Sequence, residues 1–349
     1  MKGYLFATII ISLILSAFAT LDLKEFDTLK TAKVGTETLS YREINVSSKK
    51  TFIFLHATTC SSLMLNTGDL LTNLAPLLAD YRVLALDLRG NGGSTYVTPV
   101  KDFYDFASDI KLFLDGLGLK KVIMMGTCLG GLVSQIFAAK YPAYLQGLIL
   151  DGALGIEGGF DLFADLTKVK NAPWTIADVQ TTAFYKSING ALNANDGGTT
   201  LSGIFGYYQP NQPKSQGWAA LLADMMKTKN LNEVLYGELT TNINTGTNPV
   251  NVKGSGEVVN MTGPVLIIHG KGDKFVPYAE AQKLATVLGS KCTLVLLPEA
   301  VGHFTWYDDM ANTIAPIKTF LNTNGNFESS SAFLSAFGVI TSLLMILFA

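Results

Sequence analysis

Residues 121–142 read K-V-I-M-M-G-T-C-L-G-G-L-V-S-Q-I-F-A-A-K-Y-P. The run 122–125 is short and apolar, as in a strand buried on both faces, and residues 132–141 are apolar at helical spacing before Pro142. A strand that passes directly into a helix forces the residue between them into strained backbone geometry. Gly126 and Gly130 lack the side chains that would keep the two elements apart. The sequence therefore predicts that Cys128 is lifted out of the sheet at a G-x-C-x-G turn, where the elbow motif usually has serine.

This position makes Cys128 a candidate nucleophile. The backbone N–H groups that open the following helix favour a thiolate and can also hold an oxyanion. The alternative is an inert buried cysteine, which is the commoner state of a free thiol. The glycines on both sides of Cys128 favour the nucleophile.

Composition limits the classes of partner. The chain has 349 residues and a net charge of −2, and no basic run is longer than two lysines. We therefore expect no nucleic-acid partner. The length fits one large α/β domain with an insertion, or two smaller domains.

The N-terminus resembles a secretory signal peptide. Lys2 precedes an apolar run from Tyr4 to Phe18, and Ala17-Phe18-Ala19 is a small-x-small cleavage site. We expect residues 1–19 to be removed; the alternative is a signal anchor. Two N-glycosylation motifs, at Asn45 and Asn260, fit a secreted glycoprotein.

The C-terminus resembles a GPI-attachment signal. After a polar segment, residues 332–349 are apolar apart from Ser335, Thr341 and Ser342, and no charge follows. A retained membrane helix is the alternative, but such a span normally keeps basic residues on its cytoplasmic side. Either interpretation of residues 323–349 anchors the protein to a membrane and places the folded part on the extracellular face of the plasma membrane.

Strands and helices alternate along the chain. A hairpin is predicted at 31–44, strands at 51–55, 83–86, 122–125, 145–150, 264–269 and 292–297, and helices from after the 51–55 strand to about 81, and at 103–117, 278–288 and 307–321. This order predicts an α/β fold with a mostly parallel sheet and helices on both faces. The rhythm breaks after 155, so we expect a core of residues 20–154 and 263–322 with a helical lid, residues 155–262, inserted in it. Aromatic residues of the lid are candidates to line a pocket: Trp174, Tyr185, Phe205, Tyr207, Tyr208 and Trp218.

Three reactive side chains follow three of these strands. Cys128, Asp273 and His303 come in the order nucleophile, acid, histidine, and the C-terminal ends of parallel strands meet at one edge of the sheet. His303 is expected to take the proton of Cys128, and Asp273 to fix the ring tautomer. The backbone N–H groups of Thr58 and Leu129 are expected to form the oxyanion hole.

Each assignment has an alternative. Asp273 lies in G-K-G-D and is also suited to a turn, and Asp151 is a rival acid at the end of the 145–150 strand. His56 and His269 are expected to brace loops by hydrogen bonds.

Three cysteines are an odd number, so in an oxidising compartment at least one thiol stays free or pairs with another molecule. Cys60 lies in the oxyanion loop, and oxidation that joins it to Cys128 would silence the site. Cys292 begins the last strand and is expected to be a core thiol.

Between Lys33 and Leu321 the chain resembles the lid-bearing α/β-hydrolase superfamily. The resemblance lies in His56, Asp87-x-Arg89-Gly90-x-Gly92-x-Ser94, Gly126-x-Cys128-x-Gly130, His269-Gly270-x-Gly272-Asp273 and Gly302-His303. It implies hydrolysis of an ester, thioester or amide of a small molecule, with no metal and no organic cofactor.

The chain departs from that family at two positions. Ala57 stands where the family has glycine after the oxyanion-loop histidine, and Cys128 replaces the usual serine. Cysteine excludes the aspartate mechanism of epoxide hydrolases. Dienelactone hydrolases share a cysteine elbow but lack a lid of this size, so their substrate does not transfer. The two departures also support a second interpretation, a binding protein at the cell surface that keeps the fold without turnover.

Overall fold

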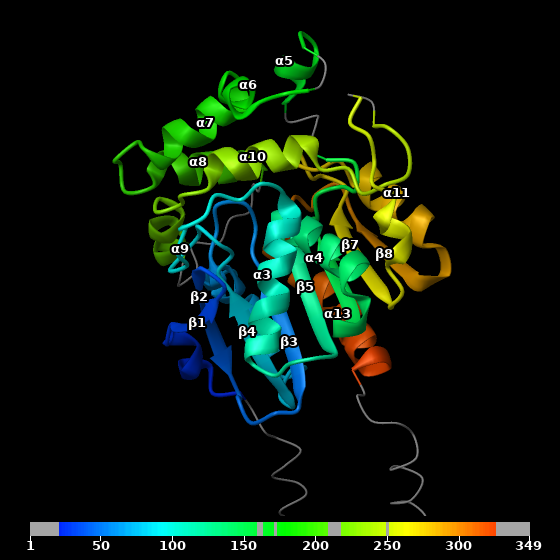
Figure 1. The fold of residues 1–349 in the computed structure, drawn as a ribbon. Coiled ribbons are helices and arrows are strands. Elements are labelled where there is room, and N and C mark those ends of the chain that lie inside the picture. The colour runs from blue at the N-terminus through cyan, green and yellow to red at the C-terminus, as the bar shows by residue number, and fades with distance from the viewer. Residues whose placement is uncertain (1–20, 159–162, 171–172, 209–217, 249–250, 326–349) are drawn as a thin grey trace, which may run out of the picture.

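The computed structural model describes residues 21–158, 163–170, 173–208, 218–248 and 251–325. In these residues a sheet of eight strands has the order β1-β2-β4-β3-β5-β6-β7-β8 (Figure 1). β1 and β2 form an antiparallel hairpin, β2 also pairs antiparallel with β4, and the remaining pairs are parallel. The strands are β1 (Lys30–Val34), β2 (Glu37–Ile44), β3 (Lys50–Leu55), β4 (Tyr81–Leu86), β5 (Val122–Thr127), β6 (Leu145–Asp151), β7 (Val265–Gly270) and β8 (Cys292–Leu297).

The strand order reverses between β3 and β5. From β3 the chain moves outward to β4, and then returns to place β5 on the other side of β3. Loops that leave the C-terminal ends of two strands at such a point diverge and leave a crevice. All residues of β5 and β7 are buried, as expected for strands covered on both faces. The loops after β3 and β5, which leave neighbouring strands at the same edge of the sheet, therefore border this crevice.

Helices cover both faces of the sheet. α3 (Phe103–Gly116) and α4 (Leu129–Lys140) pack side by side on one face, and α13 (Met310–Asn324) contacts α2 (Leu70–Leu74) on the other (Figure 1). The other core helices are η1 (Leu23–Asp27), η2 (Ser62–Asn66), η3 (Pro142–Tyr144), η5 (Glu257–Asn260), α11 (Tyr278–Leu288), η6 (Gly289–Lys291) and α12 (Thr305–Asp308).

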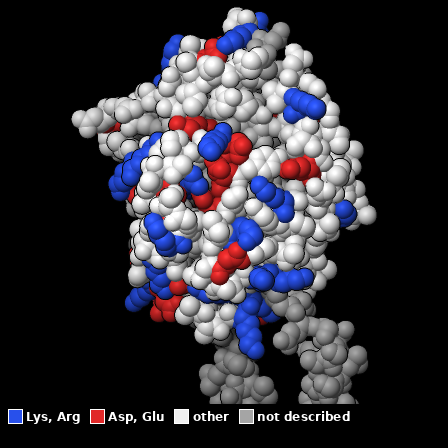
Figure 2. Space-filling view, in the orientation of Figure 1, with Lys and Arg blue, Asp and Glu red and all other residues white. Residues whose placement is uncertain are grey.

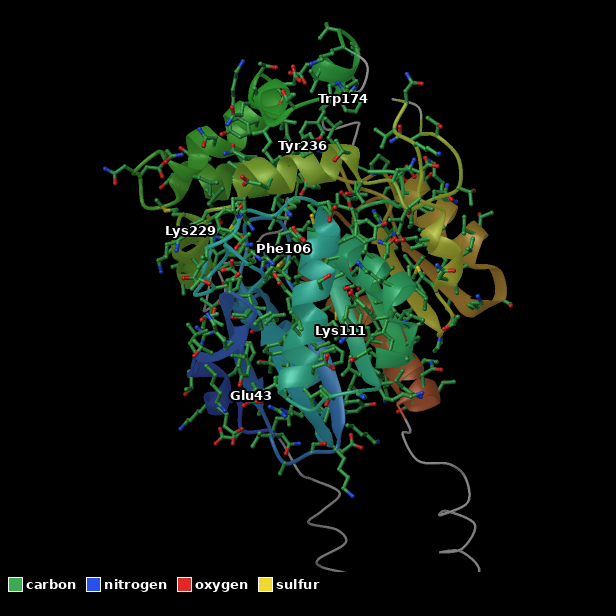
Figure 3. All side chains as sticks on the ribbon, viewed as in Figure 1. Glu43, Phe106, Lys111, Trp174, Lys229 and Tyr236 are labelled. Carbon is green, nitrogen blue, oxygen red and sulfur yellow. The ribbon has the colours of Figure 1, made fainter. Side chains whose placement is uncertain are left out.

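A lid lies over the strand ends, between β6 and β7 in sequence. Figure 1 shows α7, α8 and α10 across the top of the sheet, and Trp174 and Tyr236 lie in this layer in Figure 3. η5 also falls between β6 and β7 but packs against α4 of the core. The lid helices are α5 (Ala164–Thr167), α6 (Ile176–Gln180), α7 (Ala183–Leu192), α8 (Thr199–Tyr208), α9 (Trp218–Met225) and α10 (Leu231–Thr240).

Two helices differ from the sequence prediction. The helix expected up to about residue 81 is replaced by η2 and α2, because Gly68 and Asp69 both have positive φ between them. The last helix is broken at Asp309, whose non-helical backbone ends α12 and whose carboxylate accepts from the N–H of Asn312 to cap α13.

The visible face in Figure 2 has no large patch of one charge. Basic and acidic side chains are interspersed on the face in Figure 2, and most of that face is uncharged. Within the described ranges, none of the helices has the length and apolar character to cross a bilayer. The expected signal peptide, and the C-terminal signal from residue 326 on, lie outside the described residues.

Candidate active site

Cys128 occupies the turn between β5 and α4. Its φ of 52° and ψ of −121° are unfavourable for a residue with a side chain. A Cβ on Gly130 would lie 2.3 Å from the carbonyl oxygen of Leu55, and one on Gly126 would lie 2.4 Å from that of Gly130. The two glycines therefore permit the close approach that holds Cys128 in this strained conformation. Cys128 as a whole residue is 2% exposed.

Asp273 and His303 form a hydrogen-bonded pair beside this turn. Nδ1 of His303 donates to Oδ2 of Asp273 at 2.7 Å. Oδ1 of Asp273 accepts from the backbone N–H groups of Phe275 and Val276, each at 2.8 Å. The carboxylate is therefore fixed by its own loop and in turn fixes the ring of His303.

The electrostatics favour a charged pair. Burial alone would raise the pKa of Asp273, but the charge of His303 and the hydrogen bonds from His269 and His303 hold it well below its usual range. Burial alone would lower the pKa of His303, but Asp273 and then Cys128 raise it well above its usual value. His303 is thus suited to carry the proton of a thiolate–imidazolium pair with Cys128.

The second ring nitrogen of His303 is available for chemistry. Nε2 is buried, and among the described residues it has no partner at hydrogen-bond geometry. Cys128 raises the pKa of this ring, and both side chains line the same cavity. The structure therefore brings together the three side chains that the sequence proposed for the triad.

Of the two residues proposed for the oxyanion hole, Thr58 lines the same cavity. Thr58 follows β3, and its Oγ1 lies 3.8 Å from Sγ of Cys128, while Leu129 is the first residue of α4. The backbone N–H groups of Thr58 and Leu129 find no acceptor among the described residues. The φ angle of Ala57 is not positive, so its methyl group causes no left-handed backbone strain. Ala57 also lines the cavity.

The other two histidines hold loops together. Nε2 of His56 accepts from the N–H of Leu88 at 3.0 Å, and Nδ1 donates to the carbonyl of Ala57 at 2.8 Å. Nε2 of His269 lies 2.9 Å from the carbonyl of Val276 and 3.0 Å from Oδ2 of Asp273. His269 thus braces the acid loop and supports the orientation of Asp273.

The D-x-R-G-x-G-x-S segment braces the neighbouring loops. Asp87 accepts from Ser40 Oγ and from the N–H of Gly93. Nε and Nη2 of Arg89 donate to Asp109 on α3 at 2.8 and 2.6 Å. These contacts fix the strand end beside the oxyanion loop but bring no reactive group to Cys128.

Asp151, the rival acid, is the last residue of β6. It is fully buried, and its Oδ1 accepts from the hydroxyl of Thr305, while Oδ2 has no hydrogen-bond partner in the described residues. Burial raises the pKa of Asp151 to about 7. His303 directs its Nδ1 to Asp273 instead, so the geometry favours Asp273 as the acid.

All three cysteines are free thiols. Cys60 is fully buried in the oxyanion loop, and burial together with Cys128 raises its pKa well above the usual value. Cys292 is half-buried at the start of β8. Since thiolates, not thiols, react, the environment of Cys60 disfavours ready oxidation.

The glycosylation candidates differ in exposure. Asn260 is exposed at the end of η5. The amide of Asn45 donates both of its protons, to the carbonyls of Ala79 and Tyr81 at 3.1 Å each. In the folded chain Asn260 is therefore the more accessible acceptor.

The cavity above Cys128 has an apolar wall. Its empty space is about 500 Å³, part of which is open to solvent. Phe275 and Phe304 contribute from the core, and Phe184, Ile188, Leu201 and Ile204 from the lid helices α7 and α8. Trp174, Tyr185 and Trp218 are not among the lining residues, and the side chains of Phe205, Tyr207 and Tyr208 lie outside the described part.

No cluster of His, Cys, Asp or Glu suited to a metal ion occurs in the described residues.

Glu238 is a residue that the sequence analysis missed. It lies on α10, is fully buried, and its Oε1 accepts from the hydroxyl of Thr58. Its position in the sequence could have indicated burial. Glu238 has the helical spacing of Leu231, Val234 and Leu235, so it lies on a helix face that is otherwise apolar. A lone carboxyl on an apolar face points to a buried polar contact.

Comparison with known proteins places this chain in a family. A family model described as the alpha/beta hydrolase fold matches residues 50–309, well over half of the chain. The chain therefore belongs to the α/β-hydrolase fold family, which supports the expectation that it is a hydrolase.

Individual similarities are more distant. An uncharacterized protein of Mycobacterium tuberculosis is 25% identical over 273 residues, which cover 75% of this chain and 74% of that protein. Epoxide hydrolase 4 of Mus musculus is 36% identical over 74 residues, 21% of this chain and 21% of that protein. An esterase of Exiguobacterium antarcticum superposes with a TM-score of 0.63 at 16% identity, covering 84% of this chain and 100% of the esterase. At that identity the esterase shows a shared fold.

Proposed function

We propose that the protein hydrolyses an ester or thioester, or less readily an amide, of a small molecule with a hydrophobic acyl group. The observation that carries the proposal is the 2.7 Å bond from His303 to Asp273 beside an elbow thiol at the floor of an apolar cavity. The acyl group would contact Phe184, Phe275 and Phe304. The apolar lining of the cavity suits a hydrocarbon acyl chain.

Acyl transfer would begin at sulfur. His303 takes the proton of Cys128, and the thiolate attacks the carbonyl carbon, so that a C–S bond forms and the C=O electron pair moves to oxygen. The N–H groups of Thr58 and Leu129 stabilise this oxyanion. Collapse breaks the bond to the leaving group, which receives the proton from His303 and departs as an alcohol, thiol or amine.

Deacylation would repeat the same steps with water. His303 removes a proton from water as the oxygen attacks the thioester carbonyl. The C–S bond then breaks, the carboxylic acid leaves, and the proton returns from His303 to sulfur. Asp273 keeps the ring oriented and stabilises its positive charge throughout.

A panel of p-nitrophenyl esters and acyl-N-acetylcysteamine thioesters, from acetyl to octanoyl, tests the proposal, with Cys128→Ala as the blank. We expect hydrolysis well above the blank and a mass increase on Cys128 equal to one acyl group. Absence of both would overturn the proposal. If the same compounds bind without turnover, as detected by calorimetry, the chain is instead a binding protein, as the substitutions at Ala57 and Cys128 suggested.

We also propose, from the two chain ends, that the mature protein is attached to the extracellular face of the plasma membrane. Treatment of intact cells with phosphatidylinositol-specific phospholipase C separates the two anchors. Release into the medium is expected for a GPI anchor, whereas retention indicates a membrane helix. Absence of the protein from the cell surface would contradict both.

A further inference from the structure

The lid contributes a buried carboxyl group to the neighbourhood of the candidate nucleophile. Glu238 extends from α10 and is fully buried, with Oε1 bonded to the hydroxyl of Thr58. Its other oxygen, Oε2, has no hydrogen-bond partner within the described ranges. A buried carboxyl with one unsatisfied oxygen is costly when ionised, so its presence calls for an explanation.

The hydroxyl of Thr58 connects this carboxyl to the thiol. Oγ1 of Thr58 is bonded to Glu238 and also lies 3.8 Å from Sγ of Cys128. A hydroxyl group has one proton to donate but can accept through two lone pairs. If Glu238 is ionised, Thr58 must donate to the carboxylate. If Glu238 is neutral, the carboxylic acid can donate to Thr58, and the hydroxyl proton is free to turn toward sulfur.

We propose that Glu238 is a positioning residue that, in its neutral form, directs the hydroxyl of Thr58 toward Cys128, where it donates to the thiolate and then to the oxyanion. Thr58 would thus serve the site twice, through its backbone N–H and through its hydroxyl. The oxyanion part rests on the proposed function, whereas the effect on the thiolate does not require turnover. Glu238 keeps its proton and only donates it in a hydrogen bond to Thr58, so no covalent bond is made or broken at Glu238.

The charge environment supports a neutral Glu238 at moderately low pH. Burial raises the pKa of Glu238 to about 7, although the hydrogen bond from Thr58 and the charge of His303 lower it. His303, from the loop before α12, is the titratable group that acts on this carboxyl. Below the pKa of Glu238 the hydroxyl of Thr58 is free for sulfur, and above it the hydroxyl is held by the carboxylate.

The rate at which iodoacetamide alkylates Cys128, measured from pH 5 to 9, tests this arrangement. Glu238→Gln keeps the shape and always donates an amide proton to Thr58. Thr58→Val removes the hydroxyl, and Thr58→Ser restores it. Glu238→Gln/Thr58→Val completes a double-mutant cycle. Thermal melting confirms that each variant is folded.

We expect the wild-type profile to show an inflection near pH 7, the pKa of Glu238, that is missing from Glu238→Gln and Thr58→Val. At pH 6, Thr58→Val should react about tenfold more slowly, since a hydrogen bond to a charged group is lost, and Thr58→Ser should react like wild type. In the Thr58→Val background, Glu238→Gln should change nothing further. Wild-type reactivity of Thr58→Val at pH 6, or an inflection that persists in Glu238→Gln, would overturn the proposal.

The test is independent of ester hydrolysis. If no substrate is turned over but the alkylation profiles differ as described, the role of Glu238 stands and the proposed function fails. If esters are hydrolysed and all profiles coincide, the function stands and the role of Glu238 fails.

Discussion

Asp273 accepts a hydrogen bond of 2.7 Å from Nδ1 of His303 through the same oxygen, Oδ2, that lies 3.0 Å from His269. The other oxygen of Asp273 is bound by two backbone N–H groups of its own loop. Four donors therefore surround one buried carboxylate, and the ring of His303 has a single favourable orientation. Nε2 of His303 is therefore the ring nitrogen that remains for proton transfer with Cys128 in the proposed mechanism.

Replacing Asp273 by Asn should reduce kcat for ester hydrolysis by roughly a thousandfold, because the amide favours the wrong tautomer of His303. The matched control is Asp151→Asn, which changes the rival acid and should reduce kcat less than tenfold. Steady-state kinetics on one p-nitrophenyl ester provide the measurement. The opposite ranking of the two variants would make Asp151 the acid.

The stability of the fold should depend on pH through Asp151. Its pKa in the folded state, about 7, is raised above the unfolded value, because burial favours the neutral form. The free-energy penalty is the cost of ionising the buried carboxyl of Asp151. It is absent when the folded and unfolded states are both protonated, grows as pH rises from about 4 to about 7, and stays constant above that. Asp151→Asn should therefore stabilise the protein by roughly 4 kcal/mol at pH 8 and by little at pH 4. Urea unfolding at the two pH values checks this, and equal increments would contradict it.

The elbow should not tolerate a methyl group at Gly130. A Cβ there would lie 2.3 Å from the carbonyl oxygen of Leu55, a backbone atom that cannot move aside, so Gly130→Ala should cost about 3 kcal/mol or more. Gly116→Ala on α3 is the control, because nothing lies within 4 Å of its Cβ position. Gly116→Ala should be neutral or stabilise by about 0.5 kcal/mol. Similar melting temperatures for both variants would refute the close packing at the elbow.

The lid wall should set acyl-chain length. Ile188 lines the cavity from α7, so Ile188→Trp should fill part of the acyl space and raise KM for octanoyl esters about tenfold, with little change for acetyl esters. The adjacent Ser187 is exposed, and Ser187→Trp should leave both values unchanged. A chain-length profile of kcat/KM for the two variants is the measurement. Equal effects on acetyl and octanoyl esters would mean that the acyl group lies elsewhere.

Local patterns were sufficient to predict the strands of the sheet and the places of Cys128, Asp273 and His303 beyond the strand ends. The apolar run at 122–125 with Gly126 and Gly130 predicted the elbow. Gly126 makes room for the helix that follows its own strand, whereas Gly130 makes room for the carbonyl of Leu55 on the neighbouring strand β3, a contact that no local pattern specifies. Asp273 and His303 could be proposed because each follows a strand whose C-terminal end must lie at the same edge of the sheet. The break at Asp309 was missed, because a side-chain cap competes there with helical periodicity.

The contents of the cavity were not predictable in the same way. Phe184 and Phe275 line it instead of the proposed lid tryptophans, because the orientation of each lid helix depends on how it packs on the core. Glu238 meets Thr58 across 180 residues of sequence, and no local pattern specifies that contact. Contacts between an insertion and its host domain, such as this one, are seen only in the assembled structure.

The near-complete burial of Cys128 has a consequence for its survival in an oxidising milieu. Cys128 is 2% exposed as a residue and lines an apolar cavity, so its sulfur would be shielded from bulky disulfides such as oxidised glutathione, while a slim acyl compound could still reach it. An unpaired thiol can persist under these conditions without a protective partner. Steric seclusion, and not chemical inertness, would then preserve the reactive form between catalytic cycles.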